Sequence, residues 1–488
     1  DVTQVEKTES SIQEVHDTHD GGVNSVTIPN DTILTPQLAE QLQSELIAEY
    51  PDVFQQELHA KLPDIKPGDA THVIKVKSEE KETPSRGFYP VPLHMYQKAR
   101  DVVMDHVKGG RLVPSSAPYA SPVFFNPKKE PGVPPRMLCD FRKRNANTVK
   151  DATCVPTVEE ILRLARGKYW AKFDLTNAFS QIRMDPASQH LTAINTPWGC
   201  YEWTIMPQGL QNSPATWQRM INKALAGLIG DICFAYVDDV IIYGAETIQE
   251  HMDRCRKVLD RLKEAGLLVN PMKSTLFAEK IEMLGHYISE KGIEVDDKKV
   301  KQILAWPQPR TKREIQRFMG LVNWVRKFLP RLAIPAKVLT ALTRKRIPFK
   351  WEPQHEAAFE KIKKIAADTP VLRPLDYKSG EPVWLVVDAC KEGLGCALLQ
   401  GPTRDTAHPI AFLSRAYRGE PKSEMNPAPK GEYAYHVYEQ ELAAVMYALE
   451  KWEHLLLGIP FTICTDHESI MHLMSKKSLK PLEMRWAQ

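Results

Sequence analysis

Two adjacent acids, Asp238 and Asp239, lie between two runs of strand-forming residues in the segment FAYVDDVIIY, residues 234–243. The pattern predicts a β-hairpin that carries both carboxylates at its tip. Asp is also common in ordinary turns, so the pair alone has a simpler explanation. However, charge held against an apolar sheet is costly unless it is compensated, and a divalent metal ion would compensate it. The segment is therefore a candidate metal site.

A third acid, Asp174, ends a predicted strand in the segment YWAKFDLTNAF, residues 169–179, and a helix is predicted to start near Thr176. By itself, an Asp in this position would more often cap a helix. Together with Asp238 and Asp239 it supplies three carboxylates, and oxygen ligands of this kind suit two Mg²⁺ ions. In two-metal chemistry one ion activates an attacking hydroxyl and the other stabilises the leaving phosphate.

A second set of acids lies near the C-terminal end of the chain. Asp388 ends a predicted strand, Glu441 lies in the first turn of a predicted amphipathic helix over Tyr438–Trp452, and Asp466 follows another predicted strand. Each has an ordinary explanation alone, since Asp466 would cap a helix and Glu441 would be a solvated first-turn residue. Acids at two strand ends and on a helix can also converge on a metal pair.

The composition is that of a globular protein with several domains. At roughly 100–200 residues per domain, 488 residues predict two to four domains. No apolar run approaches the roughly 18–20 residues of a membrane span, so no membrane partner is expected. The eight cysteines are scattered without a CxxC pair, which indicates free thiols in a reducing compartment. Because the chain begins with Asp1 rather than Met, we expect a piece of a longer product.

Charge is distributed unevenly along the chain. Residues 1–60 contain twelve Asp or Glu and one Lys, so the net charge of +3 for the whole chain leaves +14 on the remainder. A basic body favours a polyanionic partner such as nucleic acid, although a solvated surface of mixed charge explains it equally well.

Composition and periodicity divide the chain into four regions. Residues 1–60 are predicted to be an acidic, partly disordered linker, in which Leu38 to Ile47 can form a short helix after the turn at Pro36. Helix and strand signals alternate within residues 61–295, whereas residues 296–378 contain helices separated by prolines. Residues 379–488 begin a new α/β unit.

One helix of the third region has clear boundaries in the sequence. Thr311 and Glu314 form a predicted capping box that opens it. The members of its apolar stripe are Phe318, Leu321, Val325 and Phe328, and the basic residues off the stripe are Arg313, Arg317 and Lys327. That basic face suits a surface that follows a nucleic-acid backbone, or equally a solvated helix face.

These segments belong to an ordered series of motifs. The series comprises ASPVF at 120–124, RMLCDFR at 136–142, FDL at 173–175, MPQGL at 206–210, the Asp pair, and LGH at 284–286. In this order the motifs closely resemble the reverse transcriptase of gypsy-class long-terminal-repeat retrotransposons, from about Leu62 to the end of the chain. The resemblance implies an α+β multidomain fold: a right-hand polymerase of fingers, palm and thumb, followed by a connection and an α/β ribonuclease H-like domain.

The resemblance implies roles for residues that would contact the nucleotide. Lys129 and Arg136 would hold the incoming triphosphate, and the guanidinium suits phosphate because of its fork of donors. Gln208 would contact the nucleotide near its sugar, and Phe179 would be the steric gate that excludes ribonucleotides. Simpler explanations remain open: Lys129 as a loop residue, Gln208 as a turn residue and Phe179 as a core residue.

The resemblance also implies a primer grip and two metal sites. Leu284, Gly285 and His286 match the primer grip, although an ordinary strand-to-strand turn explains them too. Each acid set would hold two Mg²⁺ ions, for which Mn²⁺ can substitute. The family carries a fourth nuclease carboxylate beyond Gln488, so this chain by itself is expected to cleave hybrid RNA weakly or not at all.

The implied partners are an RNA template, a DNA primer and its product, an RNA–DNA hybrid, and dNTPs. The sequence has no Asp-Thr-Gly or Asp-Ser-Gly protease motif and no zinc knuckle, so a protease and an integrase are expected elsewhere on a parent polyprotein. The implied location is intracellular and cytoplasmic, in virus-like particles.

Three functional hypotheses follow from the sequence. The first is an active RNA-directed DNA polymerase, the second a non-enzymatic nucleic-acid-binding relic, and the third an interaction protein that uses its acidic N-terminal arm. The presence of Asp174, Asp238 and Asp239 together favours the first hypothesis, because a relic has no need of acids held only for metal.

Overall fold

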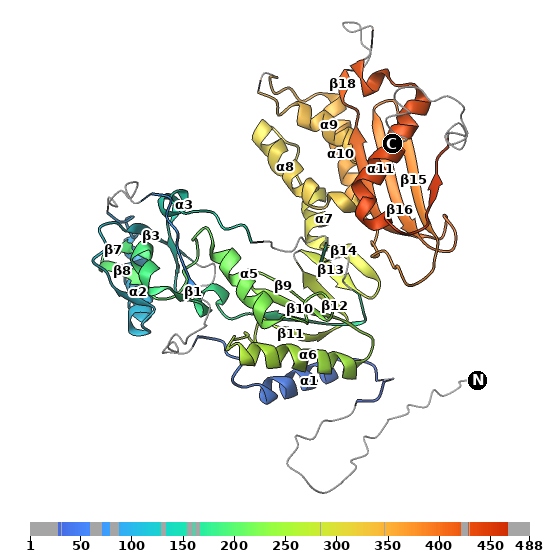
Figure 1. The fold of residues 1–488 in the computed structure, drawn as a ribbon. Coiled ribbons are helices and arrows are strands. Elements are labelled where there is room, and N and C mark those ends of the chain that lie inside the picture. Colours follow the sequence, from blue (N-terminus) through green and yellow to red (C-terminus); the bar gives the residue numbers. More distant parts are fainter. Residues whose placement is uncertain are drawn as a thin grey trace, which may run out of the picture.

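The computed structural model describes residues 28–30, 32–58, 71–78, 87–127, 133–153, 160–161, 166–283, 285–345, 347–420, 428 and 430–466. Figure 1 shows a lower part of sheets and helices and an upper part of helices and a second sheet, which are joined through α7, Asp297–Leu304. The buried hydrophobic residues form three cores. Among the described helices, none has the length and apolar character that a membrane crossing needs.

The sheet that carries the first acid set is antiparallel, with strand order β11-β5-β10-β9. Successive side chains of a strand point to opposite faces, so each strand contributes to two cores. Phe173 and Val240 belong to the first core, and Trp170 and Ile241 to the second. The strands are β5 Tyr169–Asp174, β9 Cys233–Tyr236, β10 Asp239–Ala245 and β11 Thr275–Ala278, and the covering helices are α5 Ser213–Ala224 and α6 Ile248–Glu264.

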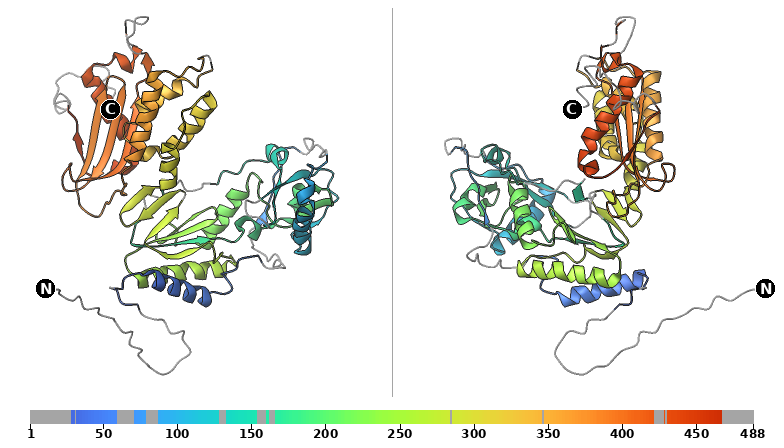
Figure 2. Two further views of the ribbon diagram at one scale, coloured as in Figure 1. Left: turned by 180° about the vertical axis from the view of Figure 1, so that it is seen from behind. Right: turned by 45° about the vertical axis from the view of Figure 1, so that its right-hand side comes forward.

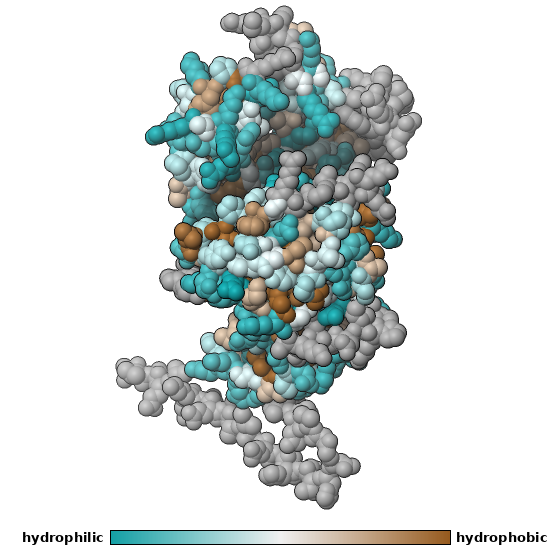
Figure 3. Space-filling model, turned by 90° about the vertical axis from the view of Figure 1, so that its left-hand side faces the viewer, coloured by the Kyte–Doolittle hydropathy of each residue, from teal (hydrophilic) through white to brown (hydrophobic). Residues whose placement is uncertain are grey.

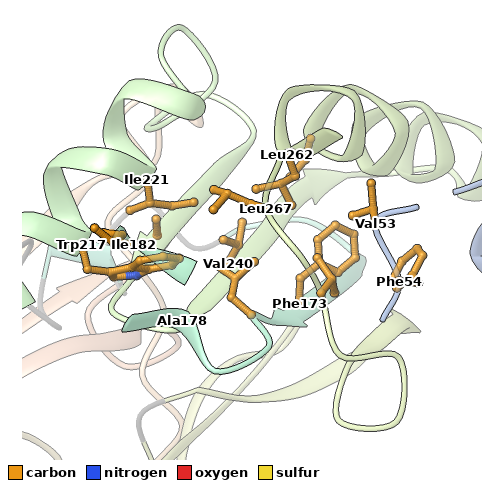
Figure 4. Packing of buried hydrophobic residues seen from close by; sticks show 14 of the residues in the cluster. Val53, Phe54, Phe173, Ala178, Ile182, Trp217, Ile221, Val240, Leu262 and Leu267 are labelled. Carbon is orange, nitrogen blue, oxygen red and sulfur yellow. The ribbon is translucent and has the colours of Figure 1, made fainter. Parts of the chain in front are cut away.

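Figure 4 shows how the first core fills the space beneath this sheet, with Val240 between the α5 residues Trp217 and Ile221 on one side and Leu262 on the other. Trp217 and Val240 are fully buried. Because burying apolar surface is the main favourable term in folding, this packing fixes how the α5 side chains sit under the β9–β10 hairpin.

The predicted short helix at 38–47 is confirmed as α1 Pro36–Glu49, and this helix is part of the first core although the region around it is predicted as a linker. Leu42 and Leu46 are buried, and Figures 1 and 2 show α1 beside α6. Glu49 also forms an ion pair with Arg256 of α6 at 3.1 Å. The apolar face of α1 outweighs the acidic composition that suggested a linker.

The fingers region contains a five-stranded sheet with order β2-β8-β7-β3-β4. Its elements are α2 Tyr96–Lys108, β2 Leu112–Pro114, β3 Ser121–Asn126, β4 Arg136–Cys139, α3 Arg142–Ala146, β7 Ile194–Thr196 and β8 Gly199–Trp203. A small parallel pair joins β1 Thr71–His72 to β6 Arg183–Met184. The described part of this region also contains three short 3-10 helices, which are Leu93–Met95, Ala178–Gln181 and Pro186–Thr192.

The second core joins a three-stranded sheet to four helices. These elements are β12 Lys280–Met283, β13 His286–Ser289, β14 Gly292–Val295, α7, α8 Lys312–Trp324, the 3-10 helix Arg326–Phe328, α9 Ala333–Ala341 and α10 Pro353–Ala367. The Thr311 hydroxyl caps α8 by accepting from Glu314 N at 3.2 Å, but the Glu314 carboxylate accepts from Arg310 N instead of closing the predicted box on Thr311. Phe318, Val325 and Phe328 are buried, as the predicted stripe requires.

The third core belongs to a four-stranded sheet of order β17-β16-β15-β20, against which the long helix α11 packs. The elements are β15 Val383–Cys390, β16 Gly393–Gln400, β17 His408–Ala416, β18 Gly419–Glu420, β19 Lys430–Gly431, the 3-10 helix Glu432–Ala434, α11 Val437–Leu456 and β20 Thr462–Cys464. On the face shown in Figure 3, hydrophobic residues occur singly or in small groups.

We expect Leu46→Ala to destabilise the protein by about 2–5 kcal/mol, because it leaves a cavity in the first core. The exposed neighbour Glu45→Ala should change the free energy of unfolding by less than about 0.5 kcal/mol. Urea unfolding followed by circular dichroism measures both. Equal stability of the two variants would show that α1 is not integral to the palm.

Candidate active sites

The acid pair lies where the sequence predicts it, at the tip of the β9–β10 hairpin. Tyr236 pairs with Asp239, so Val237 and Asp238 form a two-residue turn. Val237 has a left-handed φ of 52°, which is strained for a β-branched residue. The buried Trp217 indole donates to the Val237 carbonyl, and Leu175 N donates to the Asp238 carbonyl at 2.9 Å. These bonds hold the tip in place.

The register of β5 and β10 brings the third acid to the same place, since Asp174 pairs directly with Asp239. The backbone of Asp174 is fixed on both sides. Its N–H donates to Ser274 Oγ at 3.0 Å, and its carbonyl accepts from Asn270 N at 2.7 Å. Side chains of directly paired residues lie on one face of a sheet, so the two carboxylates are neighbours.

Burial and mutual repulsion disfavour the charged forms of these acids. Burial raises the pKa of Asp174 and of Asp239, and the nearby Asp238 raises both further. Two lysines act in the opposite direction. Lys172 Nζ lies 2.7 Å from Asp239 Oδ2, and Lys273 Nζ lies 3.9 Å from Asp174 Oδ1. The site therefore concentrates negative charge that cations must offset.

A cavity of about 630 Å³ opens beside these acids. Its lining includes Asp174, Asp238, Arg136, Phe179 and Gln208, so five predicted site residues from separate segments meet there. Arg136 Nη2 donates to Gln208 Oε1 at 2.5 Å, which links the fingers strand β4 to the loop before α5. Lys129 lies outside the described residues.

Two details at this cavity differ from the sequence expectation. Asp239 is not among the lining residues, because its carboxylate is bound to Lys172. Phe179 lies in a short 3-10 helix that follows a left-handed Asn177, φ 47°, rather than in a regular helix from Thr176. Its ring packs edge-on against Trp217 at a centroid distance of 6.5 Å, while the residue also borders the cavity.

The predicted primer grip lies at the tip of the β12–β13 hairpin, where Met283 pairs with His286. Leu284 is outside the described residues, and Gly285 has a φ of 77°. A side chain at Gly285 would collide with the Trp324 ring, 2.4 Å from an added Cβ. His286 stacks on Trp324 at 4.7 Å, and burial lowers its pKa to about 4, so the imidazole is neutral at pH 7. The tip is thereby fixed against α8.

The second acid set also comes together. In the parallel pair of β15 and β20, Val386 lies opposite Cys464, and Asp388 and Asp466 each follow two residues later. Glu441 of α11 is buried, and its Oε1 accepts from Ala389 N at 2.9 Å. Burial, with Asp466 and Asp388 nearby, raises the pKa of Glu441 to about 7. Contrary to the sequence expectation, β15 continues past Asp388 to Cys390. The burial of Glu441 excludes the alternative that it is a solvated first-turn residue.

The donor chemistry of both acid sets fits a hard divalent cation, since each offers carboxylate oxygens that repel one another without one. Among the described residues, however, no group of three or more His, Cys, Asp and Glu side chains is arranged to hold a metal ion. Cationic side chains contact acids of both sets instead: Lys172 and Lys273 pair with Asp239 and Asp174, and Arg331 lies 3.5 Å from Asp388.

Sequence reasoning missed the cations that contact the acids. The sequence could have predicted the contact of Lys172, because this residue lies two positions before Asp174 on a strand and therefore on the same face of the sheet. The sequence could not have predicted the contacts of Lys273 and Arg331, because only the tertiary fold brings these side chains to the acids.

Comparison with known proteins agrees with this geometry. Residues 127–288 match the family described as reverse transcriptase (RNA-dependent DNA polymerase), and residues 378–488 match the RNase H-like domain found in reverse transcriptase. A solved foamy viral protease-reverse transcriptase in complex with dsDNA has a TM-score of 0.77 at 25% identity, covering 95% of this chain and 94% of that one. The same viral protein with an RNA/DNA hybrid has a TM-score of 0.69 at 24% identity, covering 93% and 59%.

The fold and the matched regions define the class: a right-hand polymerase fold of the reverse transcriptase type followed by an RNase H-like domain, which confirms the predicted fold class. More particularly, the chain is similar to retrotransposon polyproteins. The Transposon Tf2-3 and Tf2-7 polyproteins of Schizosaccharomyces pombe (strain 972 / ATCC 24843) are each 29% identical over 437 residues, which is 89% of this chain and 31% of the relative. The chain thus spans about a third of the length of these relatives.

The raised pKa of Glu441 has a consequence for stability. A carboxyl whose pKa rises from 4.5 to about 7 on folding binds more protons in the folded state, so its contribution to stability falls as pH increases between these values. We expect Glu441→Gln to remove this loss. Urea unfolding in EDTA at pH 5 and pH 8 should show the variant gaining more stability over the wild type at pH 8 than at pH 5. A pH-independent difference would contradict the assignment.

Proposed function

We propose that the chain is an RNA-directed DNA polymerase that copies RNA and DNA templates into DNA. The observation that carries the proposal is the meeting of Asp174, Asp238, Arg136, Phe179 and Gln208 around one cavity between fingers and palm. Two acids, a guanidinium, an amide and an aromatic ring are the groups that metal-assisted transfer of a nucleotide requires.

Asp174, Asp238 and Asp239 would hold two Mg²⁺ ions, or Mn²⁺ in their place, which supply activation of the primer hydroxyl and stabilisation of the leaving pyrophosphate. For Asp239 this requires release from Lys172, which holds it at 2.7 Å. The backbone bonds at Asp174 and at the hairpin tip keep the acids in position before substrate arrives, so little reorganisation is left for the reaction itself.

Arg136 would bind the triphosphate of a dNTP, with Lys129 as a second cation. Its bond to Gln208 orients both side chains toward the cavity, where Gln208 would contact the nucleotide near its sugar. Phe179 would lie beneath the sugar and exclude a 2′-hydroxyl. Since Trp217 packs against it, the ring has little freedom to yield.

The primer strand would be held by the β12–β13 tip, Leu284 to His286, which Trp324 braces from α8. Double-stranded DNA and an RNA/DNA hybrid are bound by the foamy viral relatives of known structure, which supports template and primer as partners here. In the longer parent protein, the RNase H-like domain would cleave the RNA of such a hybrid through Asp388, Glu441 and Asp466.

The parent protein would be a gypsy-class retrotransposon polyprotein that carries a protease and an integrase elsewhere, as the similarity to transposon polyproteins supports. It would act inside the cell, in cytoplasmic virus-like particles.

Asp238→Asn and Asp239→Asn should each lower primer extension on an RNA template by at least about 100-fold, because metal-bound charge stabilises the transition state. Binding of the template–primer should stay within about twofold, since basic residues elsewhere contact the phosphates. Asp231→Asn, an exposed acid just before β9, is the matched control and should extend normally. Near-normal turnover by either site variant in Mg²⁺ would refute the assignment and favour a non-enzymatic role.

Phe179→Val should admit ribonucleotides, because the smaller side chain leaves room for a 2′-hydroxyl. We expect the ratio of ribonucleotide to deoxynucleotide incorporation to rise at least about tenfold, the size of effect that a steric change in a binding pocket produces. Single-nucleotide extension with dATP and ATP measures this ratio. If the ratio stayed unchanged while dATP use fell, Phe179 would be a core residue only.

A further inference from the structure

The segment that joins α8 to α9 is strongly basic. Residues 326–337, RKFLPRLAIPAK, contain four cationic side chains and no acid. Three of the four contact neighbouring groups. Arg326 Nη2 donates to a β17 carbonyl at 3.3 Å, Lys327 lies over an adjacent aromatic ring, and Lys337 lies 4.8 Å from the centre of the Tyr433 ring. The fourth, Arg331, points instead at a nuclease acid.

The backbone of Arg331 is strained and firmly held. Its φ is +55°, a left-handed conformation that is uncommon for a residue other than glycine, asparagine or aspartate. The flanking Leu329 and Leu332 are both buried, and Ala333 N donates to Ser414 Oγ of β17 at 3.1 Å. The turn is therefore anchored on both sides, and the strained residue lies against the RNase H-like sheet. Figure 1 shows α9 beside that sheet.

The guanidinium of Arg331 reaches across to the second acid set. Its Nη2 lies 3.5 Å from Asp388 Oδ2, and the two side chains are 79% and 57% exposed. An ion pair this open to solvent adds little stability, which does not offset the strain of the left-handed backbone. The arginine thus has no evident benefit for folding. Strained backbone conformations occur most often at active sites and ligand-binding sites, so the strain at Arg331 indicates a functional residue.

We propose that Arg331 binds a backbone phosphate of the RNA–DNA hybrid at the nuclease site, so that a residue outside the RNase H-like domain completes its substrate-binding surface. This inference rests on the proposed ribonuclease function. The guanidinium has five donors in a planar fork, a shape that suits phosphate. Both Arg331 and Asp388 are open to solvent, so a duplex has access to the pair.

The test is a double-mutant cycle between Arg331 and single phosphates, made with the full 488-residue chain. A set of RNA–DNA hybrids, each with one neutral methylphosphonate at a successive position of the RNA strand, is bound in Ca²⁺ buffer and followed by fluorescence anisotropy. The wild type should lose about tenfold in affinity at one or two positions, as loss of a charged hydrogen bond predicts. Arg331→Ala should bind the unmodified hybrid about tenfold more weakly and lose nothing further at those positions.

Two more variants separate recognition from folding. Arg331→Gly relieves the backbone strain, so its melting temperature should equal or exceed that of the wild type while hybrid affinity falls as in Arg331→Ala. Lys345→Ala removes an exposed cation of the same helical region and should leave affinity and the methylphosphonate profile unchanged. If Arg331→Ala kept the wild-type affinity and the wild-type profile, the inference would be wrong.

The outcome is distinguishable from failure of the proposed function. Arg331 lies at the second acid set and does not line the polymerase cavity, so primer extension by the wild type reports on the proposed function independently of this inference. Wild-type protein that extended primers, yet showed no Arg331-dependent phosphate, would overturn this inference alone. Wild-type protein that did not extend primers in Mg²⁺ would overturn the proposed function itself.

Discussion

The direct pairing of Asp174 with Asp239 across β5 and β10 is the constraint on which the polymerase site depends. A shift of one residue in this register would turn every side chain of one strand to the opposite face of the sheet. Residues of the first core would then point into the second core, and the two carboxylates would no longer be neighbours. The register is secure because both faces of the sheet are covered, one by the first core and the other by the second. Packing far from the chemistry thus fixes where the carboxylates lie.

The site holds costly features that the surrounding structure supports. Val237 is strained, and burial raises the pKa of Asp174 and Asp239. A fully buried Trp217 holds the strained turn, and two lysines offset the acids. A preformed cluster of like charge is unfavourable for the fold alone, but it is well suited to bind cations, which is why such clusters mark functional sites.

The second acid set is also held in place by packing, through contacts between the helical region and the RNase H-like domain. Ser414 of β17 accepts bonds from both Arg326 and Ala333, so the α8–α9 connection is fixed to the sheet edge. Glu441 of α11 is buried and bonded to the backbone of β15, which keeps its carboxylate near Asp388 and Asp466. The two acid sets are therefore both built from short-range strand geometry and long-range packing.

The sequence by itself determined the local features of this protein. Two runs of strand-forming residues on either side of Asp238 and Asp239 predicted the hairpin, because strand propensity and turn chemistry are properties of neighbouring residues. The order of the motifs predicted the fold class through the resemblance to a known family. Only the tertiary structure decided that α1 belongs to the palm core and that Asp239 is held by Lys172 rather than facing the cavity. It alone brought Arg331 to Asp388, 57 residues away along the chain. Such contacts depend on how whole elements pack, and packing joins residues whose separation in sequence carries no local signal.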